Sequence, residues 1–359
     1  MSTAAARDAG RGAAPPAEAP LAVSVVVPTY RRPDDLRRCL AALAAQTAAP
    51  REVLVVVRDG DAASAQALIA ARHAHPRLRL RVVPVREPGQ VAALNAGVDA
   101  ASGEVVAITD DDAAPRPDWV ARVVEHFAAD PALGGLGGRD WMRIVGLLDR
   151  GVAHTVGRLQ WVGRVVGRHH LGAGAPREVE VLKGANMSYR RAALAGVRFD
   201  ARLRGSGAQV HNDLALSLAV GRVGWKLLYD PAVAVDHYPA PRHDEDQRHA
   251  FNPAAVRNMV HNETLVLLEH LRGVRRVAYA LWAPLVGTRE APGLAQWLRF
   301  LPSQRGAAGR KLAASLAGRL DGWRSWRRAT AVAPRGERRR APLTPAPRAR
   351  IDGPRAQHY

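Results

Sequence analysis

The sequence has little cysteine: Cys39 is the single one among 359 residues. One thiol cannot form an intramolecular disulfide, and it cannot build a cysteine-based metal cage. This excludes a disulfide-rich scaffold and a structural zinc site of the cysteine type. A reducing compartment such as the cytoplasm fits this composition.

Long hydrophobic runs are also missing. A helix needs about 18–20 apolar residues to cross a bilayer. The longest candidate, residues 277–287, is shorter and follows Arg275 and Arg276. Residues 1–20 lack the apolar centre of a secretory signal and are rich in Ala, Pro and Gly. We therefore expect a disordered arm over 1–20 and a cytoplasmic protein.

Acidic residues are scarce in the last quarter of the chain. Residues 271–359 contain 19 Lys or Arg and 4 Asp or Glu, out of 52 and 33 in the whole chain. The net charge of +19 therefore comes mainly from this segment. The abundance of Ala and Arg is typical of a GC-rich bacterial genome.

Apolar, β-branched runs alternate with helix-like segments over the first 110 residues. This alternation predicts an α/β fold, with a mostly parallel central sheet and helices on both faces. We expect strands at 21–27, 52–57, 78–83 and 104–109, and helices from Pro33, at 62–73 and at 90–100. Further on we expect a helix at 119–128, a short strand at 134–139 and a long loop over 141–178. After this loop we expect a strand-like run at 179–182, helices from Arg190 and at 211–222, and strands at 225–229 and 233–235.

Polar residues follow three of the predicted strands, as Thr29-Tyr30, Arg58-Asp59-Gly60 and Asp110-Asp111-Asp112. In open α/β sheets, ligands bind outside the carboxyl ends of the strands, so these ends should converge on one cleft. Adjacent carboxylates repel one another unless solvent or a cation screens them. Oxygen ligands of this kind suit Mg²⁺ or Mn²⁺. The alternative is an exposed acidic turn without a ligand.

Six motifs, in this order, resemble those of family 2 glycosyltransferases, which have the nucleotide-diphospho-sugar transferase (Rossmann-like) fold. They are Val25–Tyr30, Asp59-Gly60, Asn95–Gly97, Asp110–Pro115 with Trp119, Gly184–Arg191 and Asn212–Leu216. The resemblance covers about residues 21–240 and implies a catalytic domain there. A helical C-terminal extension over 241–329 and a disordered basic tail over 330–359 would follow.

The resemblance implies a donor site for a nucleotide-diphosphate sugar, with a UDP-sugar as the first expectation. Thr29 and Tyr30 would border the base, Asp59 would accept a hydrogen bond from it, and Asn95 would sit near the ribose and the diphosphate. The implied donor-binding residues are Pro28, Thr29, Tyr30, Asp59, Asn95, Asp110 and Asp111.

The resemblance also implies a metal ion, Mg²⁺ or Mn²⁺, held by Asp110 and Asp112. His237 follows a short predicted strand, and some members of this fold use a C-terminal histidine as a further metal ligand. A surface histidine, or one that only supports a ligand, is the alternative. The metal would neutralise charge on the diphosphate leaving group.

Asp213 would be the general base of an inverting transfer, since the family places its base in the segment that Asn212–Leu216 resembles. It would deprotonate an acceptor hydroxyl that attacks the anomeric carbon. The alternative is an acid in the first turn of a helix, favoured there by the helix dipole. Gly184, Ala185 and Asn186 would lie on the acceptor side. A glycan or a lipid-linked acceptor of bacterial cell-envelope polysaccharide synthesis is expected.

The sequence departs from the family pattern at two positions. Arg58 stands where the family often has an acidic residue, and Leu94 where it often has an arginine. Candidates to replace that arginine at the diphosphate are Lys183, Arg139 and Arg190. The glutamine-arginine-tryptophan motif of processive synthases is absent, so we expect transfer of a single sugar.

Five large apolar residues near the C-terminus have the spacing of one helix face. They are Leu312, Leu316, Leu320, Trp323 and Trp326. Basic residues surround them, so the segment 309–329 either lies on an anionic membrane surface or packs against the catalytic domain. Nucleic-acid binding is less favoured, because no recognition motif accompanies the charge.

Two other functions compete with glycosyl transfer. A nucleotidyltransferase has a similar sheet and metal but usually opens with a glycine-rich loop, and Pro28–Arg32 is not such a loop. The second is a non-catalytic protein that binds sugar nucleotides. The presence of Asp110, Asp112 and Asp213 argues against it.

Overall fold

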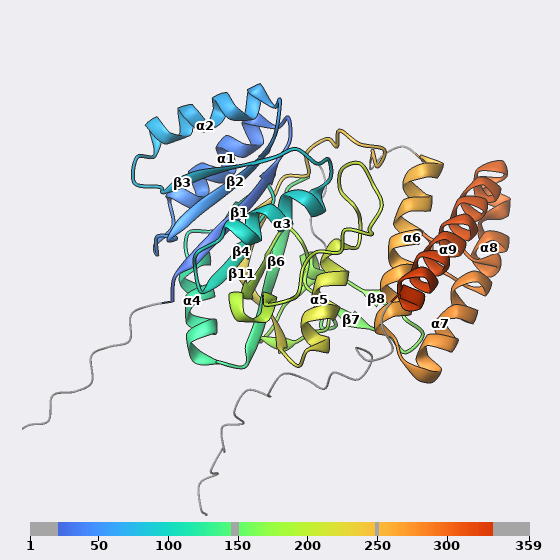
Figure 1. Cartoon of the computed structure of the whole chain (residues 1–359). Helices are drawn as coiled ribbons and strands as arrows, with labels where there is room; N and C mark the ends of the chain where they lie inside the picture. Colours follow the sequence, from blue (N-terminus) through green and yellow to red (C-terminus); the bar gives the residue numbers. More distant parts are fainter. Residues whose placement is uncertain (1–20, 145–150, 248–250, 333–359) are drawn as a thin grey trace, which may run out of the picture.

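A computed structural model describes residues 21–144, 151–247 and 251–332 (Figure 1). The predicted arm over 1–20 and the tail from 333 lie outside the described residues. Residues 330–332, predicted as part of that tail, continue the last helix. Among the described helices, none is long and apolar enough to cross a membrane. The boundary at residue 240 stays a prediction.

A central sheet occupies the first two thirds of the chain. Within the described residues it has nine strands, eight of them in the order β3-β2-β1-β4-β10-β6-β11-β5, with β9 paired to β11. A two-stranded hairpin, β7 with β8, stands apart. The strands are β1 (Val23–Thr29), β2 (Glu52–Arg58), β3 (Leu80–Val85), β4 (Val105–Ile108), β5 (Ala113–Pro115), β6 (Leu133–Met142), β7 (Arg158–Leu159), β8 (Val165–Val166), β9 (Arg177–Glu178), β10 (Met187–Arg190) and β11 (Lys226–His237).

Helices cover both faces of this sheet and then form a bundle at the C-terminal end (Figure 1). The α-helices are α1 (Pro33–Ala44), α2 (Ala62–Ala74), α3 (Gln90–Ala100), α4 (Trp119–Ala129), α5 (Asn212–Arg222), α6 (Pro253–His270), α7 (Gly273–Leu285), α8 (Leu294–Gln304) and α9 (Gly306–Val332). Two single 3₁₀ turns are η1 (His169–Leu171) and η2 (Arg191–Leu194).

The predicted parallel strands are confirmed in the first half of the sheet. β1 pairs in parallel with β2 and β4, and β2 pairs in parallel with β3. Their side chains alternate between two cores: Val25 and Val27 face α1 and α4, whereas Val26 faces α3. Because both faces of β1, β2 and β4 are covered, these strands read as continuous apolar runs, whereas β3 lies at the sheet edge and is partly exposed.

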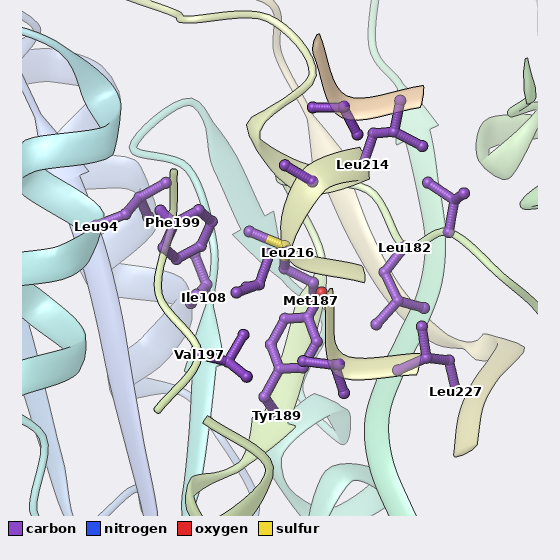
Figure 2. Close-up of a cluster of buried hydrophobic side chains, with 14 of the residues drawn as sticks. Leu94, Ile108, Leu182, Met187, Tyr189, Val197, Phe199, Leu214, Leu216 and Leu227 are labelled. Carbon is purple, nitrogen blue, oxygen red and sulfur yellow. The ribbon is translucent and has the colours of Figure 1, made fainter. Parts of the chain in front are cut away.

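The second core brings together elements that are far apart in sequence. Figure 2 shows Leu94 of α3, Ile108 of β4 and Tyr189 of β10 converging with Leu216 of α5. Buried leucines of α6, such as Leu265, belong to the same core. The sheet and the C-terminal helices are therefore held together by shared apolar packing, which the hydrophobic effect stabilises.

Two predictions between residues 179 and 194 are wrong. Residues 179–182 form no strand; Val181 and Leu182 are buried in a loop, and Leu182 N donates to Ser217 Oγ over 3.0 Å. The nearest strands are β9, which ends at Glu178, and β10, which begins at Met187. The helix expected from Arg190 is only the turn η2, after which Gly196 turns the chain at φ 72°. A short buried apolar run does not distinguish a strand from a packed loop.

The two strands predicted at 225–229 and 233–235 are one strand, β11, with an irregularity in its pairing between Asp230 and Ala234. Such a bulge bends a strand without ending it. Beyond the bulge, β11 pairs with β5. The long loop predicted over 141–178 contains the hairpin β7–β8 and the short strand β9, while residues 145–150 lie outside the described part.

The long helix α9 packs on α6 through small residues. Gly318 lies against the backbone of Arg257, and Gly322 against that of His261. α6 belongs to the predicted C-terminal extension, whereas the sequence interpretation was packing against the catalytic domain. From α9, Asp321 pairs with Arg204 of that domain over 2.9 Å. Leu316 and Leu320 stay exposed beside the contact with α6.

Candidate donor and metal site

A cavity of about 460 Å³ opens at the carboxyl ends of β1, β2 and β4. The predicted convergence of strand ends is therefore found for Thr29-Tyr30, Arg58 and the acidic run. The lining residues are Pro28, Thr29, Tyr30, Arg32, Arg58, Val85, Glu87, Pro88, Gly89, Gln90, Ala93, Asp110, Asp111, Asp112, Ser206, Gly207, Ala208, Arg242, His243 and Asp244.

The acidic run is not an exposed turn. Asp111 and Asp112 are buried, and Asp110 is half-buried at the cavity. Asp111 accepts hydrogen bonds from Thr29 Oγ1 over 2.8 Å and from Arg32 Nη1 over 3.0 Å. Asp112 Oδ2 accepts one from the Ala240 amide over 2.9 Å. Each carboxylate therefore has a different set of partners, which fixes its orientation.

Strand pairing brings His237 to the acidic run. β5 begins directly after Asp112, and its first residue, Ala113, is the register partner of His237 on β11. One ligand atom each from Asp110, Asp112 and His237 can be chosen so that all lie within 4.8 Å of one another. The three residues that the sequence named as metal ligands are therefore adjacent.

His237 stands between two carboxylates. Its Nε2 lies 3.2 Å from Asp112 Oδ1, and its Nδ1 lies 3.6 Å from Asp140 Oδ2. Burial alone lowers the pKa of His237, but Asp112 and Asp140 outweigh it and raise this pKa to about 9. Asp140 is itself buried and forms an ion pair with Lys183.

The electrostatics at the cavity favour a cation. Burial, followed by repulsion from Asp112, raises the pKa of Asp110. Burial likewise raises the pKa of Asp111 to about 7, against the opposing charge of Arg32. Neither ring nitrogen of His237 makes a well-directed hydrogen bond within the described residues. Two carboxylates and an imidazole fit Mg²⁺ or Mn²⁺, and a bound cation would relieve the repulsion.

Asp213 and the predicted acceptor-side segment are in contact. Asp213 lies in the first turn of α5, half-buried, and its Oδ2 accepts a hydrogen bond from Gly184 N over 3.3 Å. Ala185 O accepts one from Thr109 Oγ1 over 3.0 Å, at the end of β4. The segment therefore connects α5 to the strand that carries the acidic run. The role of Asp213 as base stays a prediction.

Two predicted binding residues have their side chains engaged elsewhere. Asn186 is buried; its amide accepts from Trp119 Nε1 over 2.9 Å and donates to Val233 O over 2.8 Å. Asn95 bonds the backbone of Phe199 in both directions, over 2.9 and 3.0 Å. Neither residue lines the cavity. Their predicted contacts with acceptor and donor stay predictions.

Tyr30 forms the aromatic end of the cavity. The His243 ring meets it edge-on at 6.2 Å, and the Arg58 guanidinium lies 5.2 Å from its centroid. Asp59 is exposed, lies outside the lining, and pairs with Arg86 at 3.4 Å. The aromatic face of Tyr30 suits stacking with a planar base.

The arginine that the sequence lacks at position 94 is not replaced by the three candidates. Lys183 pairs with Asp140, and Arg139 stacks on Trp141 at 3.5 Å. Arg190 donates to the backbone oxygens of Leu133, Phe127 and Asp130. The cavity is instead lined by Arg32, Arg58 and Arg242.

A loop from the C-terminal half of the chain closes one side of the cavity. Gly207 O accepts a hydrogen bond from Gln90 N over 2.8 Å. Non-glycine residues rarely adopt positive φ, yet Gln209 does so at 41°. Buried Asn262 of α6 holds the loop by donating to Arg204 O and Val210 O, over 2.8 and 3.0 Å.

Sequence inspection missed Asp140, Gln90 and the lining arginines Arg32 and Arg242. Asp140 directly follows the strand predicted at 134–139, but its position after that strand was not used; in the structure it lies inside β6. Arg242 lies after the last predicted strand, in a segment with no pattern of its own. Arg32 also carried a signal, since it stands one residue before a helix that follows a strand end.

Residues 24–194 match the family model described as glycosyl transferase family 2. The chain is 29% identical to glycosyltransferase AglE of Haloferax volcanii over 107 residues, which are 30% of this chain and 35% of that protein. It is 39% identical to the succinoglycan biosynthesis protein ExoO of Rhizobium meliloti over 107 residues, 30% of each chain. The chain thus spans about a third of the length of these relatives.

A solved structure covers much more of the chain. Mannosyltransferase PcManGT from Pyrobaculum calidifontis, in complex with GDP-Man and Mn²⁺, superimposes with a TM-score of 0.55 and 22% identity. The match covers 89% of this chain and 88% of that one. At this identity the likeness concerns the fold, and it confirms the predicted nucleotide-diphospho-sugar transferase fold.

Proposed function

We propose that this chain, whose residues 24–194 match the model of glycosyl transferase family 2, transfers a single sugar from a nucleotide-diphosphate donor to an acceptor hydroxyl with inversion. The observation that carries this proposal is the cluster of Asp110, Asp112 and His237 beside a cavity with an aromatic end. A UDP-sugar remains our first choice of donor. The mannosyltransferase of the same fold holds GDP-Man.

Asp110, Asp112 and His237 would hold Mg²⁺ or Mn²⁺. When bound, the ion supplies positive charge that stabilises the departing diphosphate. Arg242 and Arg32 add positive charge at the cavity wall. Tyr30 and His243 would receive the base at the opposite end. Mn²⁺ in the Pyrobaculum mannosyltransferase supports this choice of ion.

Asp213 would accept the proton of the acceptor hydroxyl. Its contact with Gly184 supports this role, because that segment resembles the acceptor side of the family. The half-buried carboxylate is also an acid in the first turn of α5, where the helix dipole stabilises its charged form. Both roles are compatible, since an ionised carboxylate is the form that takes up a proton.

For the acceptor we propose a glycan or a lipid-linked hydroxyl of a bacterial cell-envelope polysaccharide. The partial likeness to a succinoglycan biosynthesis protein supports this class. The reaction would take place in the cytoplasm. A lipid-linked acceptor would bring the chain to the inner face of the plasma membrane, and contact through residues 309–329 is one of the two interpretations of that segment.

A screen of nucleotide sugars by thermal shift tests this proposal. A donor that binds the native state raises the melting temperature, and with Mn²⁺ the rise should be larger than without it. EDTA should remove that increment. Stabilisation by nucleoside triphosphates but by no sugar nucleotide would favour a nucleotidyltransferase instead.

A further inference from the structure

Three C-terminal helices carry stripes of exposed apolar side chains. Of the large apolar residues that are exposed among the described residues, eleven lie between 274 and 323 and six in the rest. Within each stripe the spacing is three or four residues, so each stripe is one helix face. We call the following set the C-terminal apolar surface: Val274, Val277, Leu281 and Leu285 on α7, Leu294, Leu298 and Leu301 on α8, and Leu316, Leu320 and Trp323 on α9.

The exposure of this surface is unusual for side chains of this size. Val274 is 67% exposed, and Leu281 and Leu298 are each 60% exposed. The stripes belong to neighbouring helices, because α8 contacts both α7 and α9. Single exposed leucines are common in proteins, but a concentration of this kind marks an interaction site.

An exposed tryptophan lies beside the start of α7. The guanidinium of Arg275 donates to the backbone oxygens of Gln160 and Trp161, over 3.3 and 3.4 Å, and so joins the β7–β8 hairpin to this helix. The Trp161 side chain is 56% exposed. Tryptophan is a residue that prefers the boundary between lipid and water.

The exposed charge around the C-terminal apolar surface is mostly positive. Exposed arginines on the same helices and their connections are Arg272, Arg289, Arg299, Arg305, Arg310, Arg324, Arg327 and Arg328. Two acidic residues lie between positions 271 and 331: Glu290, which is exposed, and Asp321, which is buried. Asp321 is paired with Arg204 and Arg257. The free charge here is therefore strongly positive.

We propose that the C-terminal apolar surface, together with its arginines, docks on an anionic lipid bilayer. Apolar side chains would enter the boundary of the acyl chains, and the arginines would contact lipid phosphates. A second copy of the chain is a poorer occupant, because it would oppose two positively charged faces. A nucleic acid is also a poorer occupant, because its phosphates would pair with the arginines but would not bury the leucines. The proposal rests on exposure and charge and does not depend on the proposed reaction.

This surface is wider than the segment 309–329 that the sequence suggested, because it adds α7 and α8 to Leu316, Leu320 and Trp323 of the predicted α9 face. The residues of α9 that pack on α6, such as Gly318, are unavailable to lipid. Asp321 of α9 also pairs with Arg204 over 2.9 Å, next to the loop that lines the donor cavity. Docking at α7, α8 and α9 would therefore hold the cavity near hydroxyl groups carried by lipids.

Vesicle flotation with the full-length chain tests the proposal. We compare vesicles of phosphatidylcholine with vesicles that contain 30–40% phosphatidylglycerol. The wild-type chain should float with the anionic vesicles alone, and L281Q/L298Q should bind them about tenfold or more weakly, given the apolar area removed. The matched control I69Q/V223Q changes two exposed apolar residues elsewhere and should bind like the wild type.

Three results would overturn the proposal: no flotation of the wild type, equal flotation of L281Q/L298Q, or a wild-type dimer that L281Q/L298Q breaks without any vesicle binding. Because a variant can fail to fold, a second measurement uses the wild type alone. Brominated phosphatidylglycerol should quench its tryptophan fluorescence, and the absence of quenching counts equally against docking. Donor hydrolysis without vesicles should be unchanged in L281Q/L298Q. If the wild-type chain floats with the vesicles but hydrolyses no donor, the proposed reaction is refuted and the proposed docking surface is not.

Discussion

The Nδ1 atom of His237 lies 3.6 Å from Oδ2 of Asp140, a buried carboxylate that also pairs with Lys183. A carboxylate behind a metal-binding histidine fixes its ring orientation and tautomer, and its loss typically weakens metal binding by about 10–100-fold. We therefore expect Asp140→Asn to weaken Mn²⁺ binding by about tenfold, as measured by isothermal titration calorimetry.

The chain offers a matched control for this substitution. Asp230 forms a similar pair with His126, at 2.8 Å, on the same strand as His237 but outside the cavity lining. Asp230→Asn should leave Mn²⁺ affinity unchanged. Equal effects of the two substitutions would mean that Asp140 acts on stability and not on the metal site.

Asp213→Asn should lower the transfer rate by about 100-fold or more, since positioned general bases contribute roughly 10²–10⁴-fold. Binding of donor and Mn²⁺ should persist, because Asp213 lies outside the cavity lining. Steady-state kinetics and donor titration separate the two effects. Near-normal turnover would remove Asp213 from the role of base.

Arg242→Ala should raise the dissociation constant of the donor by about tenfold, because charge-assisted hydrogen bonds to phosphate contribute roughly 1.5–3 kcal/mol each. The side chain lines the cavity and is held by an ion pair with Asp246. Arg37→Ala, on the exposed side of α1, serves as the control. If Arg242→Ala and Arg37→Ala bind the donor equally well, the diphosphate is bound by a group other than Arg242.

The sequence predicted the sheet well where the chain alternates regularly. Strands up to β4 fall within two residues of their expected bounds, because β1, β2 and β4 are buried apolar runs between clear helix signals. The edge strand β3 is partly exposed and was recognised by its alternation. The metal cluster could also be predicted from the sequence, since Asp110, Asp112 and His237 stand at strand ends. The distances within this cluster depend on the order of the strands β10, β6 and β11 in the sheet. That order results from long-range strand pairing, which no local sequence pattern encodes.

The errors have a common physical origin. Val179, Val181 and Leu182 are buried apolar residues, but burial without a partner strand gives a loop. The leucines of α9 have the spacing of a packed face, yet glycines make the contact with α6 because they allow a closer approach of the backbones. Arg242 and Gly207 lie in loops, and tertiary contacts of these loops, which the local sequence does not predict, place the two residues at the cavity.

Glu52 should make stability depend on pH. It is buried, accepts hydrogen bonds from Ser24 and Ser102, and pairs with Arg81. Burial opposes ionisation, but these partners outweigh it and lower the pKa of Glu52 from 4.5 to about 2. A lowered pKa in the folded state contributes stability that is fully present above about pH 4.5 and is lost as the pH falls toward 2.

Glu52→Gln should therefore lower the free energy of unfolding at pH 7 by about 2–3 kcal/mol, and the difference from wild type should shrink below pH 4.5. Urea unfolding at several pH values measures both. Glu104→Gln removes an exposed carboxylate that accepts one hydrogen bond from Ala22 N and is the control. If the free energy of unfolding of Glu52→Gln differs from that of the wild type by the same amount at pH 7 and pH 3, the lowered pKa of Glu52 is contradicted.

The most direct test of the central claim measures release of nucleoside diphosphate from a panel of nucleotide sugars, with and without Mn²⁺. We expect release from at least one sugar nucleotide that requires the metal, is abolished by EDTA, and falls by at least about 100-fold in Asp112→Asn, since this carboxylate belongs to the ligand cluster. Release that continues unchanged in EDTA and in Asp112→Asn would contradict the metal-dependent donor site.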